Sequence, residues 1–85
     1  MTCYCIYLSD EKNGFIENAG VFPTESLAYV VAQNLAELIT KGFLFYTYND
    51  FQEPFTKVEI VEYSENNEDG YETITVFNPL EEMAK

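Results

Sequence analysis

Short runs of β-branched, aromatic and aliphatic residues divide the chain into segments of strand length, separated by polar turns. Asn13-Gly14, between the first two runs, is a strong hairpin signal because both residues tolerate the positive φ of a tight turn. The pattern predicts five strands, at residues 3–8, 15–22, 43–48, 55–63 and 71–77. It predicts loops at 49–54 and 64–70, and a short acidic tail at 80–85.

One helix is predicted after Pro23, where the apolar period changes from two residues to about 3.6. Thr24 is suited to cap its first turn, and Gly42 is suited to end it after Lys41. We expect one apolar stripe to face the core, formed by Leu27, Ala28, Val31, Leu35, Leu38 and Ile39.

The order β-β-α-β-β-β predicts an α+β fold over residues 1–85, as a single compact domain. The helix needs an apolar surface to cover, so we expect it to pack on one face of a curled antiparallel sheet of about five strands. The result is a two-layer structure. No second helix is predicted, and the opposite face of the sheet is therefore expected to be open.

Charge excludes several classes of function. The 85 residues include 15 acidic residues and four lysines, a formal net charge of −11, with no arginine, histidine or tryptophan. Four cations neutralise few phosphates, so we expect no direct nucleic-acid binding, and an acidic chain is also unsuited to anionic membranes. No apolar run approaches the roughly 18 residues needed to span a membrane.

Catalytic and metal-binding chemistry is also poorly supported. Without histidine, no serine or cysteine has an imidazole base, so we expect no enzyme, no cofactor and no metal. Residues 65–70 resemble the start of an EF-hand loop, but Val76 stands where the bidentate glutamate belongs. Cys3 and Cys5 are typical of reduced thiols in a cytoplasmic protein.

The acidic residues are concentrated in the second half of the chain. Residues 1–43 hold five acidic residues and two lysines, whereas residues 44–85 hold ten acidic residues and two lysines. Carboxylates spaced along neighbouring strands form a lattice that a basic surface recognises, and aromatic anchors add specificity. The candidate partner-binding residues are Asp50, Glu53, Glu59, Glu62, Glu65, Glu68, Asp69 and Glu72, with Tyr46, Tyr48 and Phe51 as anchors.

Small size, acidity and the lack of catalytic groups resemble the inhibitors carried by phages and other mobile elements. Those proteins imitate DNA and block restriction or CRISPR proteins. The resemblance implies an inhibitor or decoy of the DNA-mimic type, which occupies the basic nucleic-acid-binding surface of a target protein in the cytoplasm of the host cell. The alternative is a small interaction subunit or homodimer that uses the open sheet face or an edge strand. A purely solubilising acidic surface is the simplest interpretation of the charge.

Overall fold

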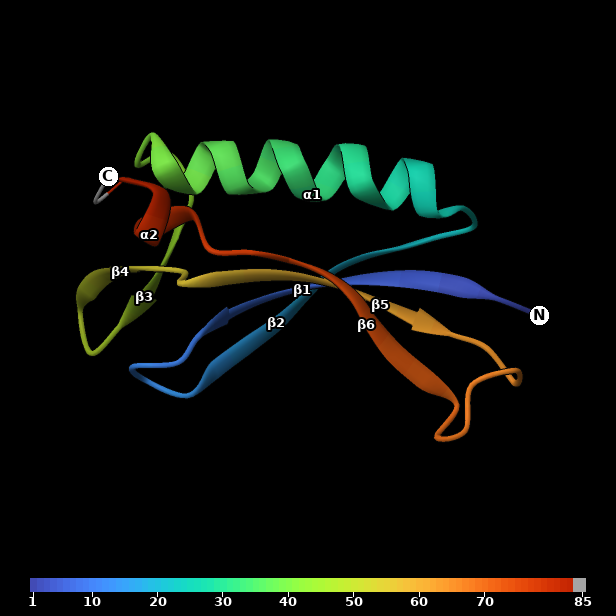
Figure 1. The fold of residues 1–85 in the computed structure, drawn as a ribbon. Coiled ribbons are helices and arrows are strands. Elements are labelled where there is room, and N and C mark those ends of the chain that lie inside the picture. The colour runs from blue at the N-terminus through green and yellow to red at the C-terminus, as the bar shows by residue number, and fades with distance from the viewer. Residues whose placement is uncertain (84–85) are drawn as a thin grey trace.

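The computed structural model describes the backbone of residues 1–83 and has the expected α+β architecture (Figure 1). Its elements are β1 (Cys3–Asp10), β2 (Phe15–Phe22), α1 (Glu25–Thr40), β3 (Phe45–Tyr48), β4 (Phe51–Pro54), β5 (Lys57–Tyr63), β6 (Tyr71–Phe77) and α2 (Pro79–Met83). Among these described residues, no helix is both long and apolar enough to cross a membrane.

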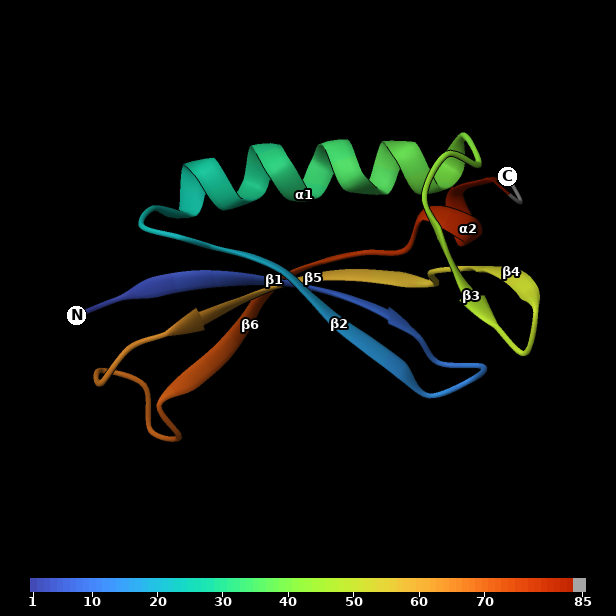
Figure 2. The same ribbon diagram turned by 180° about the vertical axis from the view of Figure 1, so that it is seen from behind.

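The main sheet has four antiparallel strands in the order β2-β1-β5-β6, and it is curled but not closed. Both helices lie on one side of this sheet, as Figures 1 and 2 show from opposite directions. The two central strands pair so that Ile6 lies opposite Ile60 and Leu8 opposite Val58. These four side chains are at most 3% exposed and form the floor of the core beneath α1.

Helix α1 begins and ends where the sequence predicts. The Thr24 hydroxyl accepts a hydrogen bond of 3.2 Å from the Leu27 N–H. At the other end, Gly42 has a φ of +79° and the Phe43 N–H reaches back 2.9 Å to the Leu38 carbonyl. Such a turn needs glycine, because a left-handed conformation carries a steric penalty for residues with a Cβ.

The buried stripe of α1 differs from the expected one. Leu27 and Leu38 are 51% and 40% exposed, while Val31 and Leu35 pack at the side of the core and are only partly buried. The buried residues of the helix are Ala28, Ala32, Ala36 and Ile39. The isoleucine, leucine and valine side chains of the sheet already fill the space between the layers, so the helix contributes small residues there.

Residues 45–54 form a separate hairpin, not a strand of the main sheet followed by a loop. Strands β3 and β4 pair only with each other, and Tyr48 lies opposite Phe51. Asn49 and Asp50 form the two-residue turn with φ values of +50° and +68°. This two-residue turn pairs β3 with the segment that directly follows it, and neither strand joins the edge strands β2 and β6 of the main sheet.

The predicted acidic tail contains a second, short helix. Helix α2 packs against the end of α1, where the Thr40 hydroxyl lies 3.0 Å from the Ala36 carbonyl and 3.5 Å from that of Pro79. Pro79 is buried at the start of α2. Residues 84–85 of the predicted tail lie outside the described residues.

Candidate partner-binding surfaces

The fold separates the predicted binding residues into two groups at opposite ends of the molecule. The β5–β6 turn lies at the end where the chain and α1 begin, and the β3–β4 hairpin lies at the other (Figure 1). Asp50, Glu53, Tyr48 and Phe51 belong to the hairpin. We call the opposite group the acidic end, which consists of Glu62, Glu65, Glu68, Asp69 and Glu72.

The acidic end is built on a hairpin whose turn has internal hydrogen bonds. Glu62 and Glu72 lie opposite each other on β5 and β6. The Asn67 side-chain amide donates a 3.1 Å hydrogen bond to Glu62, and the Asn66 N–H donates one of 3.2 Å to the Ser64 hydroxyl. The remaining acidic side chains are exposed, so this end presents carboxylates on an ordered support.

A further carboxylate extends the acidic end toward the helix. Burial raises the pKa of the Tyr4 hydroxyl, and the negative charges of Glu62 and Glu25 raise it further. Glu25, in the first turn of α1, therefore lies close enough to Tyr4 to act on the same hydroxyl as Glu62.

The described lysines lie away from the acidic end. They occupy the β1–β2 turn, the start of β5 and the residue after α1, all toward the end of the molecule that carries the β3–β4 hairpin (Figure 1). Each one faces a carboxylate: Lys12 lies 3.8 Å from Glu53, Lys41 lies 2.8 Å from Glu37, and Lys57 contacts Glu11. Among the described residues, the cation that meets the acidic end is the amino terminus, 3.3 Å from Glu65.

Two of these ion pairs shift the pKa values of their members. A hydrogen bond from Lys41 lowers the pKa of Glu37, and a hydrogen bond to Glu11 raises the pKa of Lys57. Positive charge is therefore used to offset carboxylates at one end of the molecule. The negative charge of the acidic end is not offset by these three lysines.

One predicted aromatic anchor, Tyr46, lies inside the protein. Its side chain is 8% exposed, and its ring stacks on Phe15 with centroids 4.3 Å apart. Its hydroxyl donates a 2.5 Å hydrogen bond to Asp10, and burial followed by this bond raises the pKa of Tyr46. Tyr48 and Phe51 are 42% and 70% exposed and remain available for contact.

The open face of the main sheet contains a tyrosine cluster that sequence reasoning did not select. Tyr7 on β1 and Tyr63 on β5 join through their hydroxyl groups, whose oxygens are 2.7 Å apart. The ring of Tyr71, on β6, lies 6.1 Å from that of Tyr63. With Ile16 and Glu59 they surround a hollow of about 410 Å³, which we call the tyrosine hollow. Glu59 is thus the predicted acidic residue that lies between the two ends.

A signal for this cluster was present in the strand pattern. Side chains two residues apart share one face of a strand, so Tyr7 lies on the same face as Cys5, and Tyr63 on the same face as Val61 and Glu59. The sequence pattern does not determine the strand order. The tyrosines come together because β1 pairs with β5 at the centre of the sheet and β6 lies beside β5.

We predict that Tyr63 makes stability fall at high pH. The hydrogen bond with Tyr7, followed by burial, raises the pKa of Tyr63 from 10.0 to about 12 in the folded protein. Between these two values the unfolded chain releases a proton that the folded protein keeps. This contribution to stability is complete below pH 10 and is lost as the pH rises through about 12.

Urea unfolding at several alkaline pH values tests this prediction. The free energy of unfolding should decline less steeply for Tyr63→Phe than for the parent protein. Tyr48→Phe, which changes an exposed tyrosine, should decline like the parent. Part of the decline remains in every variant, because the pKa values of Tyr4 and Tyr46 are also raised. Identical profiles for the parent and Tyr63→Phe would contradict the assignment.

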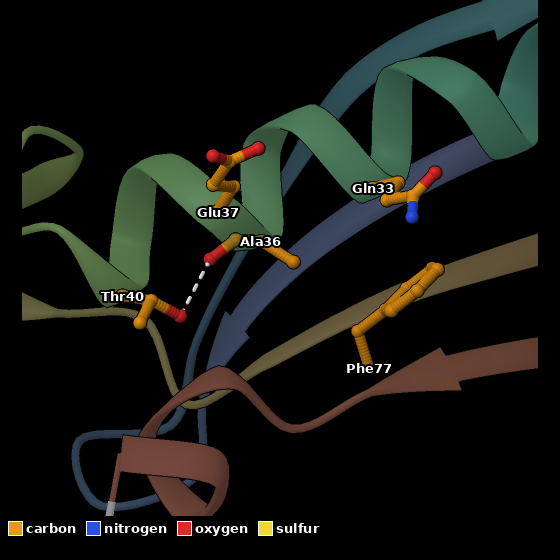
Figure 3. Close-up of a pocket in the computed structure, with 5 residues that line it drawn as sticks. All are labelled: Gln33, Ala36, Glu37, Thr40 and Phe77. Atoms are coloured by element: carbon orange, nitrogen blue, oxygen red, sulfur yellow. Dashed lines mark hydrogen bonds between the residues drawn. The ribbon is translucent and has the colours of Figure 1, made fainter.

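A notch between α1 and the edge strand β6 offers no comparable chemistry (Figure 3). It measures about 350 Å³, and Phe77 lies on the β6 side of it. The Thr40 hydroxyl is bonded to the Ala36 carbonyl, and Glu37 points away from Phe77. Within residues 1–81, whose side chains the structure describes, no three cysteine or acidic side chains come together to hold a metal ion.

Comparison with protein-family models, curated proteins and solved structures finds no match for the chain.

Proposed function

We propose that this protein is a non-catalytic inhibitor or decoy that binds a basic, nucleic-acid-binding protein through its acidic end. It acts in the cytoplasm of the host cell, and it occupies the surface that its target uses for DNA or RNA. The observation that carries the proposal is the polarity of charge along the molecule. The three described lysines are paired with carboxylates away from the acidic end. Among the described residues, the cation that contacts the acidic end is the amino terminus.

The arrangement of the carboxylates supports this role. Glu62 and Glu72 lie on adjacent strands, which are about 4.8 Å apart, and Glu65, Glu68 and Asp69 follow the turn between them. A target that normally binds phosphates presents lysine and arginine side chains in rows. The field of the acidic end attracts such a surface and speeds the encounter.

We predict that neutralising the acidic end weakens the complex far more than removing the same charge elsewhere. The test variant is Glu65→Gln with Glu68→Gln and Glu72→Gln. The matched control is Glu17→Gln with Glu37→Gln and Glu81→Gln, three exposed residues outside the acidic end. Exposed ion pairs contribute about 0.2–1 kcal/mol each, so the test variant should bind about tenfold more weakly and the control less than threefold.

The measurement is displacement of fluorescently labelled DNA or RNA from a basic protein captured from the host. The parent protein should displace the nucleic acid, with an affinity that falls as salt increases because the attraction is screened. Equal losses in the two triple variants would show that only net charge matters. A captured partner that keeps its nucleic acid at saturation would also contradict the proposal.

The open face and the free edges of the sheet favour a second candidate function, an interaction subunit or homodimer. Ile16 and Val21 on β2 are 69% and 61% exposed, and Val76 on β6 is 46% exposed. β2 and β6 are the two edge strands of the main sheet. Association through this apolar surface should persist at high salt, because hydrophobic contacts are not screened. That response separates it from binding through the acidic end.

A further inference from the structure

The lining of the tyrosine hollow, on the open face, comes from all four strands of the main sheet. Tyr7 lies on β1, Ile16 on β2, Glu59 and Tyr63 on β5, and Tyr71 on β6. Both helices lie on the other side of the sheet (Figure 2). The hollow therefore rests on paired strands, and its shape does not depend on a loop.

The walls of the hollow present aromatic rings in a fixed arrangement. The hydrogen bond between the Tyr7 and Tyr63 hydroxyls, 2.7 Å long, holds these two side chains across the neighbouring strands. The Tyr71 ring is tilted by 40° to that of Tyr63 and is 56% exposed. Tyrosine faces attract cations, and most strongly a planar guanidinium group that can stack on them.

A carboxylate of the hollow is only weakly compensated. The Glu59 side chain is 28% exposed and lies 3.9 Å from the Lys57 ammonium group, at the outer limit of an ion pair. The same ammonium group makes its close contact with Glu11. One lysine thus serves two carboxylates, and one negative charge remains in excess beside the tyrosine rings.

We infer that the tyrosine hollow binds the cationic side chain of an arginine or lysine presented by the basic partner. The charged group meets Glu59 and the tyrosine rings, and its aliphatic stem lies against the exposed side chain of Ile16 at the rim. The inference rests on the proposed function, because it supplies the aromatic anchor beside the acidic end. Tyr71 also lines a shallow hollow of the β5–β6 turn together with Glu68, Asp69 and Glu72, so the tyrosine hollow and the acidic end meet at this residue.

The occupant favoured by charge is a cation and not a second copy of this chain. Each copy carries a net charge of −11 and repels another copy. The hollow is also concave, and two copies placed face to face would leave the space between the hollows unfilled. A single protruding side chain fills such a space without bringing two acidic molecules together.

The test uses the full chain, labelled for NMR, and two small probes. Nα-acetyl-arginine amide carries the charge, and Nα-acetyl-citrulline amide has nearly the same shape without it. At about 0.15 M salt, the arginine probe should shift the ring signals of Tyr7, Tyr63 and Tyr71, and the citrulline probe should leave them in place. Charge and aromatic contacts of about 0.5–1 kcal/mol predict a loss of about 2.3-fold to 5.4-fold in affinity for Glu59→Gln and for Tyr71→Thr.

The matched control is Glu17→Gln, which removes the same charge from an exposed residue that follows Ile16 on β2. Its affinity for the arginine probe should change less than twofold. Equal losses for Glu59→Gln and Glu17→Gln, or probe shifts confined to residues 65–72, would overturn the inference and leave the proposed function standing. Tyrosine shifts that depend on protein concentration alone would show that a second copy fills the hollow, and would also overturn it.

Failure of the proposed function gives a different result. In that case the arginine probe still binds in the hollow, whereas the triple variant at Glu65, Glu68 and Glu72 displaces nucleic acid from the captured partner as well as the parent does.

Discussion

Replacing Phe55 with alanine should remove much of the stability of this small domain. Phe55 is 1% exposed and is the largest fully buried side chain. Its ring centroid lies 5.1 Å from that of Tyr46 and 6.1 Å from that of Phe15. Loss of a buried phenylalanine costs about 3–5 kcal/mol through lost transfer free energy and the cavity that remains. Domains have a total stability of only about 5–15 kcal/mol.

Phe51→Ala is the matched control, because it deletes the same side chain at a position that is 70% exposed. It should change the free energy of unfolding by less than about 0.5 kcal/mol. Urea unfolding followed by circular dichroism measures both variants. Equal midpoints for the two variants would show that Phe55 does not close the core between the main sheet and the β3–β4 hairpin.

The layers of the fold could be predicted because they depend on local patterns. The apolar runs at 3–8, 15–22 and 71–77, the β1–β2 hairpin and the Thr24 cap each depend on a few neighbouring residues, and these predictions are confirmed. The hairpin turn itself has four residues, 11–14, and of the Asn13-Gly14 pair only Gly14 has a positive φ, +67°. The stripe of α1 was less predictable. Hydrophobicity alone ranks leucine above alanine, but the space left by the sheet admits Ala32 and leaves Leu27 outside.

The β3–β4 hairpin shows what a local pattern does not determine. The run at 43–48 is apolar enough for the main sheet, but β3 pairs with its sequence neighbour β4 and joins neither of the edge strands β2 and β6. Asn49 and Asp50 were the available signal, because these residue types tolerate the positive φ of a two-residue hairpin turn.

The candidate surface was only partly predictable for a related reason. Acidic residues close together in the chain, such as Glu68 and Asp69, also lie close together in space. The aromatic residues come from distant strands, so their grouping depends on strand order. Tyr46 is buried, where its hydroxyl donates a hydrogen bond to Asp10. Tyr7 and Tyr63 are 56 positions apart in the chain and meet on the open face because β1 pairs with β5.

Replacing Asp10 with alanine should loosen the attachment of the β3–β4 hairpin to the rest of the fold. Asp10 is 2% exposed, and its carboxylate accepts hydrogen bonds from the Lys12 N–H, the Asn13 side chain and the Tyr46 hydroxyl. The first two order the β1–β2 turn, and the third joins that turn to β3. A buried carboxylate is tolerated here because hydrogen-bond donors surround it.

We expect Asp10→Ala to lower the free energy of unfolding by about 2–4 kcal/mol, because it leaves buried donors without an acceptor. Asp69→Ala, at an exposed position of the β5–β6 turn, is the control and should stay within about 0.5 kcal/mol of the parent. Tyr46→Phe keeps the ring stacked on Phe15, removes one donor and should cost about 1–2 kcal/mol.

The double variant Asp10→Ala with Tyr46→Phe decides whether the two side chains act as a pair. Each single change leaves one buried partner of the 2.5 Å hydrogen bond without the other, although the Asn13 side chain still donates to the oxygen that remains, whereas the double change removes both partners. The double variant should therefore cost less than the sum of the single variants, with a coupling of about 1–2 kcal/mol. Costs that add to within about 0.5 kcal/mol would show that Tyr46 holds the hairpin by ring packing alone, without help from Asp10.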